Sequence, residues 1–111
     1  MAPVGGLLER IYEGAVVDGA DVARVSGTHP RTVARWQVND VAPRRDTEER
    51  LLELKAVVEL LRRVMHDDAA RTWLRTPNAE LGYEKPLDEI AAGRFRAVIS
   101  LLLALAEGVT A

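Results

Sequence analysis

Residues 18–38, DGADVARVSGTHPRTVARWQV, decide the fold because they contain two short helical segments joined at a glycine. Residues 20–25 favour a helix, and Gly27 suits the left-handed conformation that ends many helices. A second helix is predicted over residues 29–38, with Thr28 as its N-cap and Pro30 in its first turn, where a missing N–H costs nothing. The stretch therefore predicts two helices separated by a sharp turn.

The spacing inside this stretch is that of a helix-turn-helix. Its helices cross closely, so the first needs a small residue, the turn needs a glycine, and the second needs a branched apolar residue. Ala23, Gly27 and Val33 meet these needs at separations of four and six residues, with Val22 and Trp36 as apolar support. The second helix would then lie in the major groove of duplex DNA. The predicted DNA-binding residues are Thr28, His29, Arg31, Thr32 and Arg35, of which the two arginines are the strongest candidates.

The charge distribution agrees with a DNA-binding first half, although the whole chain carries a net charge of −2. Residues 1–45 hold six arginines against five acidic residues, whereas residues 46–111 hold nine basic residues against twelve acidic ones. Within the first half, residues 28–45 carry four arginines against Asp40 alone. A local basic face of this kind is sufficient for contact with phosphates.

The sequence also predicts helices in the rest of the chain. We expect a first amphipathic helix within residues 4–17, after Gly5 and Gly6, and the longest helix from Asp46 to about Met65. Asp67 and Asp68 would cap a helix that reaches Thr76. A short helix from Pro86 would close at Gly93, and a final helix over residues 94–107 would close at Gly108. The prediction is an all-α protein with a helix-turn-helix lobe at residues 1–45 and a second small helical lobe at residues 46–111, which includes a long connecting helix.

Composition argues against several classes of function. The chain has no cysteine and two histidines, so thiolate chemistry is impossible and an enzyme or a metal site would have few groups to use. The longest apolar stretch, residues 97–106, is far shorter than the roughly 20 residues that span a bilayer. We therefore expect a non-catalytic, cytoplasmic protein without a cofactor, a metal or a membrane partner.

The second half carries a motif that resembles a known family. Residues 72–78, TWLRTPN, are followed by Leu81, by KPL at residues 85–87, by Gly93, and by a final helix that ends AEG at residues 106–108. This order resembles the toxin-binding domain of the Xre/MbcA/ParS antitoxins, and with the helix-turn-helix the resemblance covers nearly the whole chain. It implies a type II antitoxin that binds a RES-domain toxin, an enzyme that degrades NAD, and occludes its active site. The toxin-binding residues that it implies are Trp73, Pro77, Asn78, Lys85, Gly108, Val109, Thr110 and Ala111.

The sequence is compatible with two other functions. The chain could be a stand-alone transcription factor whose second half serves dimerisation or sensing, or a toxin-binding protein whose helix-turn-helix no longer binds DNA. Residues 101–105 are apolar on several faces of their helix, which favours contact with a toxin or with a second copy of the chain. A homodimer would also allow two operator half-sites to be read about one helical turn apart.

Overall fold

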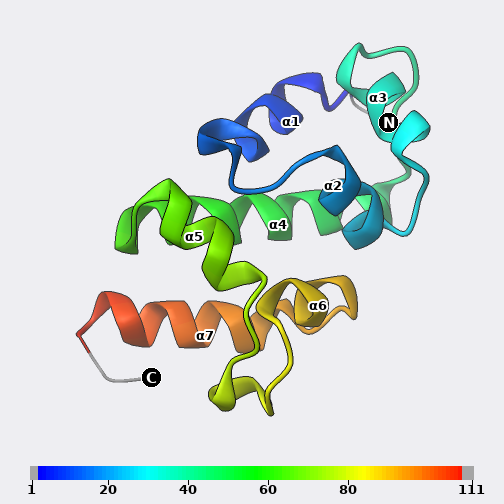
Figure 1. The fold of residues 1–111 in the computed structure, drawn as a ribbon. Helices are drawn as coiled ribbons and strands as arrows, with labels where there is room; N and C mark the ends of the chain where they lie inside the picture. Colours follow the sequence, from blue (N-terminus) through cyan, green and yellow to red (C-terminus); the bar gives the residue numbers. More distant parts are fainter. Residues whose placement is uncertain (1–2, 109–111) are drawn as a thin grey trace.

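The structure is a computed structural model that describes residues 3–108. Over this range the chain is helical, as predicted, with one isolated bridge between Asn78 and Glu84 as its β-type pairing. Figure 1 shows the helices arranged around α4. The α-helices are α1 (Gly5–Ile11), α2 (Gly19–Ser26), α3 (Pro30–Gln37), α4 (Arg45–Val64), α5 (Asp67–Leu74), α6 (Pro86–Ala91) and α7 (Phe95–Ala106), and the short 3-10 helices are η1 (Glu13–Ala15) and η2 (Ala79–Leu81).

Helices α2 and α3 form the helix-turn-helix that the sequence predicts. Asp18 caps α2 through a reciprocal capping box, in which its carboxylate accepts the N–H of Asp21 and the Asp21 carboxylate accepts the N–H of Asp18, both at 2.9 Å. Gly27 ends α2 with φ 69°, the left-handed conformation expected of it. Ala23 and Val33 are buried between the helices.

The N-cap of α3 differs from the prediction. His29, not Thr28, occupies this position, and its Nδ1 accepts the N–H of Arg31 at 3.2 Å. Thr28 instead completes the end of α2, since its N–H donates to the Ala23 carbonyl at 2.9 Å. Helix α3 therefore starts one residue later than the sequence indicates, with Pro30 as its first residue.

The first helix also differs from the prediction. Gly5 and Gly6 lie inside α1 rather than before it, and α1 ends at Ile11 rather than near Val17. The Asn39 side chain accepts the Gly5 N–H at 2.9 Å, and a Cβ on Gly5 would lie 2.7 Å from that same oxygen, so this glycine allows the start of α1 to approach the end of α3. Gly14, with φ 76°, then turns the chain away through η1.

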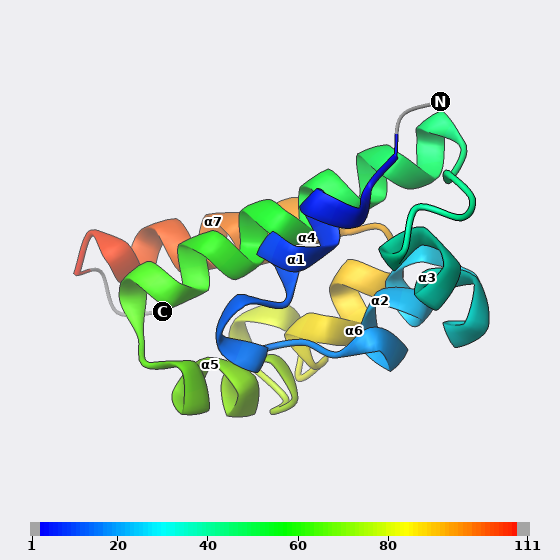
Figure 2. The same cartoon turned by 90° about the horizontal axis from the view of Figure 1, so that it is seen from above.

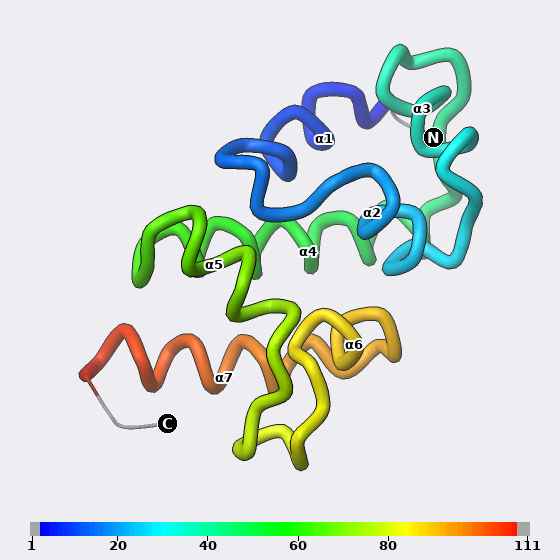
Figure 3. The backbone as a smooth tube through the Cα atoms, viewed as in Figure 1, coloured from blue at the N-terminus to red at the C-terminus, as the bar shows by residue number. Residues whose placement is uncertain are grey.

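Helix α4 is the longest element, as predicted, and the others pack around it. Figure 2 shows α4 and α7 running side by side along the molecule, with α5 and α6 both below this pair. The tube in Figure 3 shows α1, α2 and α3 above α4, and α6 and α7 below it. Buried side chains from all seven α-helices form one hydrophobic cluster, which runs from Val4 to Leu102. The expected boundary between residues 45 and 46 thus lies at the start of a helix that both halves share.

Within the described residues five arginines connect the second half of the chain to the first, among them Arg62, which pairs with Glu13 at 3.2 Å. Arg71 donates to the Ala15 carbonyl at 3.0 Å, and Arg75 donates to the Val16 carbonyl at 3.2 Å and also pairs with Asp21. Arg24 of α2 pairs with Asp88 of α6 at 2.6 Å. Arg50 of α4 lies between the last turns of α2 and α6. The helix-turn-helix is therefore held against α5 and α6 by specific polar contacts as well as by apolar packing.

Candidate functional site

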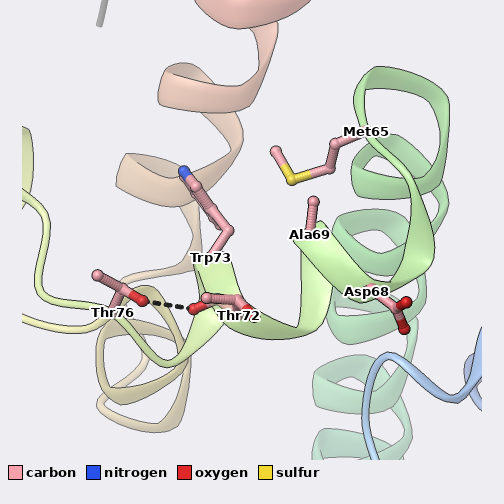
Figure 4. Close-up of a pocket in the computed structure, with 6 residues that line it drawn as sticks. All are labelled: Met65, Asp68, Ala69, Thr72, Trp73 and Thr76. Carbon is pink, nitrogen blue, oxygen red and sulfur yellow. Dashed lines mark hydrogen bonds between the residues drawn. The ribbon is translucent and has the colours of Figure 1, made fainter.

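A shallow hollow beside α5 is the first candidate surface. It has a volume of about 510 Å³, and its lining is largely apolar. Figure 4 shows the Met65, Ala69 and Trp73 side chains on one side of α5, facing the same space, while Asp68 points the other way. The lining residues are Met65, Asp68, Ala69, Thr72, Trp73 and Thr76.

The sequence places these side chains through the amphipathic pattern of α5. Ala70 and Leu74 are fully buried against the core, which turns Ala69 and Thr72 outward and leaves Trp73 half-buried at the edge. Met65 is half-buried where the chain leaves α4 in an extended conformation. A flexible thioether beside an indole gives an adaptable apolar surface that suits a protein partner.

The loop that follows α5 is built around Asn78. Its side-chain oxygen accepts the Glu80 N–H at 2.9 Å, its carbonyl accepts the Tyr83 N–H at 2.8 Å, and its own N–H donates to the Glu84 carbonyl at 3.1 Å. Pro77 lies near the start of this loop and is exposed, and Lys85 ends it as the exposed N-cap of α6. Asn78 thus fixes the shape of a surface loop between Trp73 and Lys85.

The predicted toxin-binding residues fall into separate groups. Trp73 lies at the hollow, and Pro77, Asn78 and Lys85 lie on the adjoining loop. Gly108 follows the far end of α7, which Figure 1 shows at the opposite end of that helix from the loop. Val109, Thr110 and Ala111 lie outside the described residues.

Several surface residues at or near this site were not predicted from the sequence, among them Met65, Ala69 and Tyr83. Met65 and Ala69 join Trp73 at the hollow, and Tyr83 is 74% exposed on the loop with φ 66°. Met65, Ala69 and Trp73 are spaced four residues apart, which would place all three on one face of a continuous helix. The helix is interrupted at His66, however, so this spacing alone does not predict the hollow. For Tyr83 the sequence offers an aromatic residue after a glycine, which is a weak signal.

The exposed side of α3 is the second candidate surface. Arg31 and Arg35 are exposed on α3, and His29 is exposed at its start. Val33 and Trp36 are 1% and 4% exposed, so they fix which face of the helix turns outward. The Arg35 guanidinium pairs with Asp40 at 2.9 Å, and since both groups are more than half exposed this ion pair can be exchanged for a phosphate at little cost.

The two predicted threonines lie differently. Thr28 and Thr32 are half-buried and line a hollow of about 490 Å³ between α3 and the loop that leads to α4. The structure therefore brings His29, Arg31 and Arg35 together on the outer surface and turns Thr28 and Thr32 toward the side of the motif. Base or phosphate contacts by these residues stay predictions.

One carboxylate between the two surfaces has a shifted pKa. Burial raises the pKa of Asp21 above its ordinary value, although the backbone N–H of Asp18 and the positive charge of Arg75 act to lower it. Asp21 thus serves both the cap of α2 and the contact with α5. Among residues 3–108, no group of three histidine or acidic side chains is placed to hold a metal ion, and no helix is long and apolar enough to cross a membrane.

Comparison with known proteins agrees with this architecture. Residues 60–108 match the family described as the antitoxin Xre/MbcA/ParS C-terminal toxin-binding domain. The mycobacterial cidal antitoxin MbcA of Mycobacterium tuberculosis H37Rv is 38% identical over 109 residues, which cover 96% of this chain and 90% of the relative. A probable mycobacterial cidal antitoxin of the same strain is 30% identical over 92 residues, which cover 83% of this chain and 78% of the relative.

The fold has been solved in a relative. A chain in the crystal structure of the M. tuberculosis MbcT–MbcA toxin–antitoxin complex superposes with a TM-score of 0.86 at 32% identity, with both chains fully covered. These matches define the class, that of antitoxins with an Xre/MbcA/ParS toxin-binding domain. The chain belongs to the MbcA antitoxin family within that class. The family resemblance and the all-α fold read from the sequence are thereby confirmed.

Proposed function

We propose that the protein binds a cognate RES-domain toxin through the surface formed by α5, the loop at residues 76–85 and the end of α7, and that it blocks the toxin's NAD site. The observation that carries this proposal is the apolar hollow at Met65, Ala69 and Trp73, which lies within the residues that match the toxin-binding domain. A pocket built for a dinucleotide can be closed by steric occlusion, so the antitoxin needs no catalytic group or cofactor of its own.

The hollow is tested by Ala69→Arg, which adds a long charged side chain at an exposed position and leaves the buried face of α5 unchanged. If a partner fills the hollow, the amount of protein needed to rescue growth of toxin-expressing cells rises by on the order of 10-fold or more. Ala20→Arg, at an exposed alanine on α2, is the matched control and leaves rescue intact. Full rescue by the Ala69 variant would move the toxin-binding surface elsewhere.

The end of the chain is tested separately by truncation after Glu107. The family resemblance implies that residues 108–111 approach the NAD pocket of the toxin, so the truncated protein is expected to bind the toxin but to inhibit it less. Binding is measured by calorimetry and inhibition by NAD consumption. If inhibition is complete without these residues, occlusion comes from the α5 surface and the loop alone.

We also propose that α3 binds the operator of the protein's own operon, as the exposed Arg31 and Arg35 support. Replacing both with alanine removes two phosphate or base contacts from each copy and is expected to weaken operator binding by at least 10-fold, with a smaller salt dependence. A gel shift over a series of salt concentrations measures both quantities. Unchanged affinity would favour a toxin-binding protein that does not use α3 on DNA.

A further inference from the structure

One face of α4 is turned largely away from the monomer, with Leu60 alone packing against the edge of the hydrophobic core. Leu52 is 49% exposed, Ala56 is exposed, and Leu60 is half-buried. With Glu49 and Arg63 they lie within roughly 100° of arc, because residues three, four and seven apart share a helix face. The opposite side of α4 carries Leu54 and Val58 into the core. We call the outward set Glu49, Leu52, Ala56, Leu60 and Arg63 the α4 stripe.

The charges of the α4 stripe are arranged symmetrically about its centre. Glu49 lies seven residues before Ala56 and Arg63 lies seven residues after it. Both charged side chains are exposed, and neither forms an ion pair with any residue in the part of the chain that the structure describes. A helix that carries opposite charges at equal distances from a small central residue is complementary to itself when two copies pack antiparallel.

We propose that the α4 stripe is the interface between two copies of this chain, packed antiparallel about Ala56. This interface deepens the proposed operator binding, and it rests on that function for the spacing of the two helix-turn-helix motifs. In this arrangement Glu49 of each copy faces Arg63 of the other, and Leu52 lies at the level of the partner's Leu60. The two Ala56 residues meet at the centre, where a small side chain lets the helices approach closely.

The charge pattern selects this orientation over the parallel one. Parallel packing would place Glu49 against the partner's Glu49 and Arg63 against the partner's Arg63, and like charges at facing positions destabilise a helix pair. Antiparallel packing replaces both repulsions with attractions. A stripe of three apolar side chains flanked by these charges therefore specifies the orientation of its partner as well as its presence.

The same arrangement also places the two helix-turn-helix motifs suitably for DNA. Figure 1 shows α3 above the start of α4, so an antiparallel pair carries one motif at each end. At 1.5 Å per residue the two Arg45 ends lie about 33 Å apart along the interface. This is close to the spacing of about 34 Å between half-sites one helical turn apart.

Charge exchange tests the interface directly. Sedimentation equilibrium of the purified full chain is expected to show a dimer, and Glu49→Arg or Arg63→Glu is expected to raise its dissociation constant on the order of 10- to 30-fold, since each change creates two repulsive pairs. The double variant restores the opposite charges in exchanged positions and is expected to dimerise nearly as well as the unchanged protein. The double variant also has any loss of helix stability that the two single changes cause. Recovery of its dimerisation would therefore come from the restored charge pairs.

Leu52→Glu and Leu103→Glu form a matched pair, because these leucines are 49% and 48% exposed on α4 and α7. The first is expected to yield a monomer and the second a dimer. The proposal is overturned by an unchanged protein that is monomeric, by single charge variants that dimerise normally, by failure of the double variant to recover, or by dissociation through Leu103→Glu instead.

Inhibition of the toxin by the same variants is a separate measurement. Loss of inhibition with an intact dimer would overturn the proposal and assign the α4 stripe to the toxin. Loss of the dimer with full inhibition supports the proposed interface and leaves the proposed toxin binding unaffected.

Discussion

Arg50 connects three parts of the molecule through one guanidinium group. Its Nη2 donates to the carbonyls of Val25, Ile90 and Ala91 at 3.1, 3.3 and 3.1 Å. These carbonyls lie in or just before the last residues of α2 and α6, where helices leave their acceptors unpaired and where a cation is favoured. A single side chain thus satisfies the ends of two helices and fixes their positions relative to α4.

Arg50→Ala is expected to lower the free energy of unfolding by roughly 2 kcal/mol, because hydrogen bonds from a charged donor are lost and backbone acceptors are left without a partner. Arg50→Lys keeps the charge but lacks the planar fork, so it should recover part of the loss. Urea denaturation measures both. Arg96→Ala, at an exposed position on α7, serves as control and should change stability by less than about 0.5 kcal/mol.

The ion pair between Glu89 and Arg94 makes the stability of the fold depend on pH. Its carboxylate accepts two hydrogen bonds from Arg94, at 2.9 and 3.0 Å, and these hold the pKa of Glu89 below its ordinary value of 4.5. A depressed pKa in the folded state gives stability that is present above pH 4.5 and is lost as the pH falls through the folded value. The melting temperature of Glu89→Gln should therefore fall less steeply below that pH. An equally steep fall would mean that the Glu89–Arg94 pair does not contribute to acid denaturation, and Glu9→Gln on the surface of α1 should behave like the unchanged protein.

At the scale of elements, the sequence predicts best where one residue type has one structural role. Gly27 is predicted to end α2 because few residues other than glycine adopt a positive φ easily, and it does so at 69°. The N-cap of α3 is missed because Thr28 is a better cap by residue type, and the cap was decided instead by the extra backbone hydrogen bond that Thr28 makes to the end of α2. The start of α1 is missed because Gly5 is explained by a contact with Asn39, which is distant in sequence.

Ala23 lies where α2 and α3 pack against each other. Ala23 is 2% exposed, so Ala23→Leu adds three carbons to a filled space and is expected to cost about 1–3 kcal/mol of stability and to weaken operator binding. Ala20→Leu places the same side chain on the exposed face of α2 and should have little effect. Thermal unfolding and a gel shift measure the two consequences. Equal behaviour of the two variants would mean that the helices do not cross at Ala23.

For the whole molecule, the pattern of residues predicts two lobes, while the structure shows how closely they are joined. The hydrophobic cluster continues from α1 to α7, and Arg24, Arg71 and Arg75 add polar contacts between residues before and after position 45. Local periodicity contains no information on such pairings, which connect residues more than 50 positions apart. The hollow beside α5 was beyond prediction for the same reason, since it depends on the angle at which the chain leaves α4 at Met65. The division of labour between residues 1–45 and 46–111 stays a prediction.

Inhibition of the toxin is measured as the rate of NAD consumption by the purified cognate toxin as this protein is titrated against it. If this protein occludes the toxin's NAD site, the unchanged protein reduces the rate to background near equimolar amounts. The variant with Arg31 and Arg35 both replaced by alanine should inhibit equally well, because its changes lie on α3, whereas Ala69→Arg should require a large excess. An NAD-consuming toxin that remains fully active in the presence of excess unchanged protein would contradict the proposed inhibition.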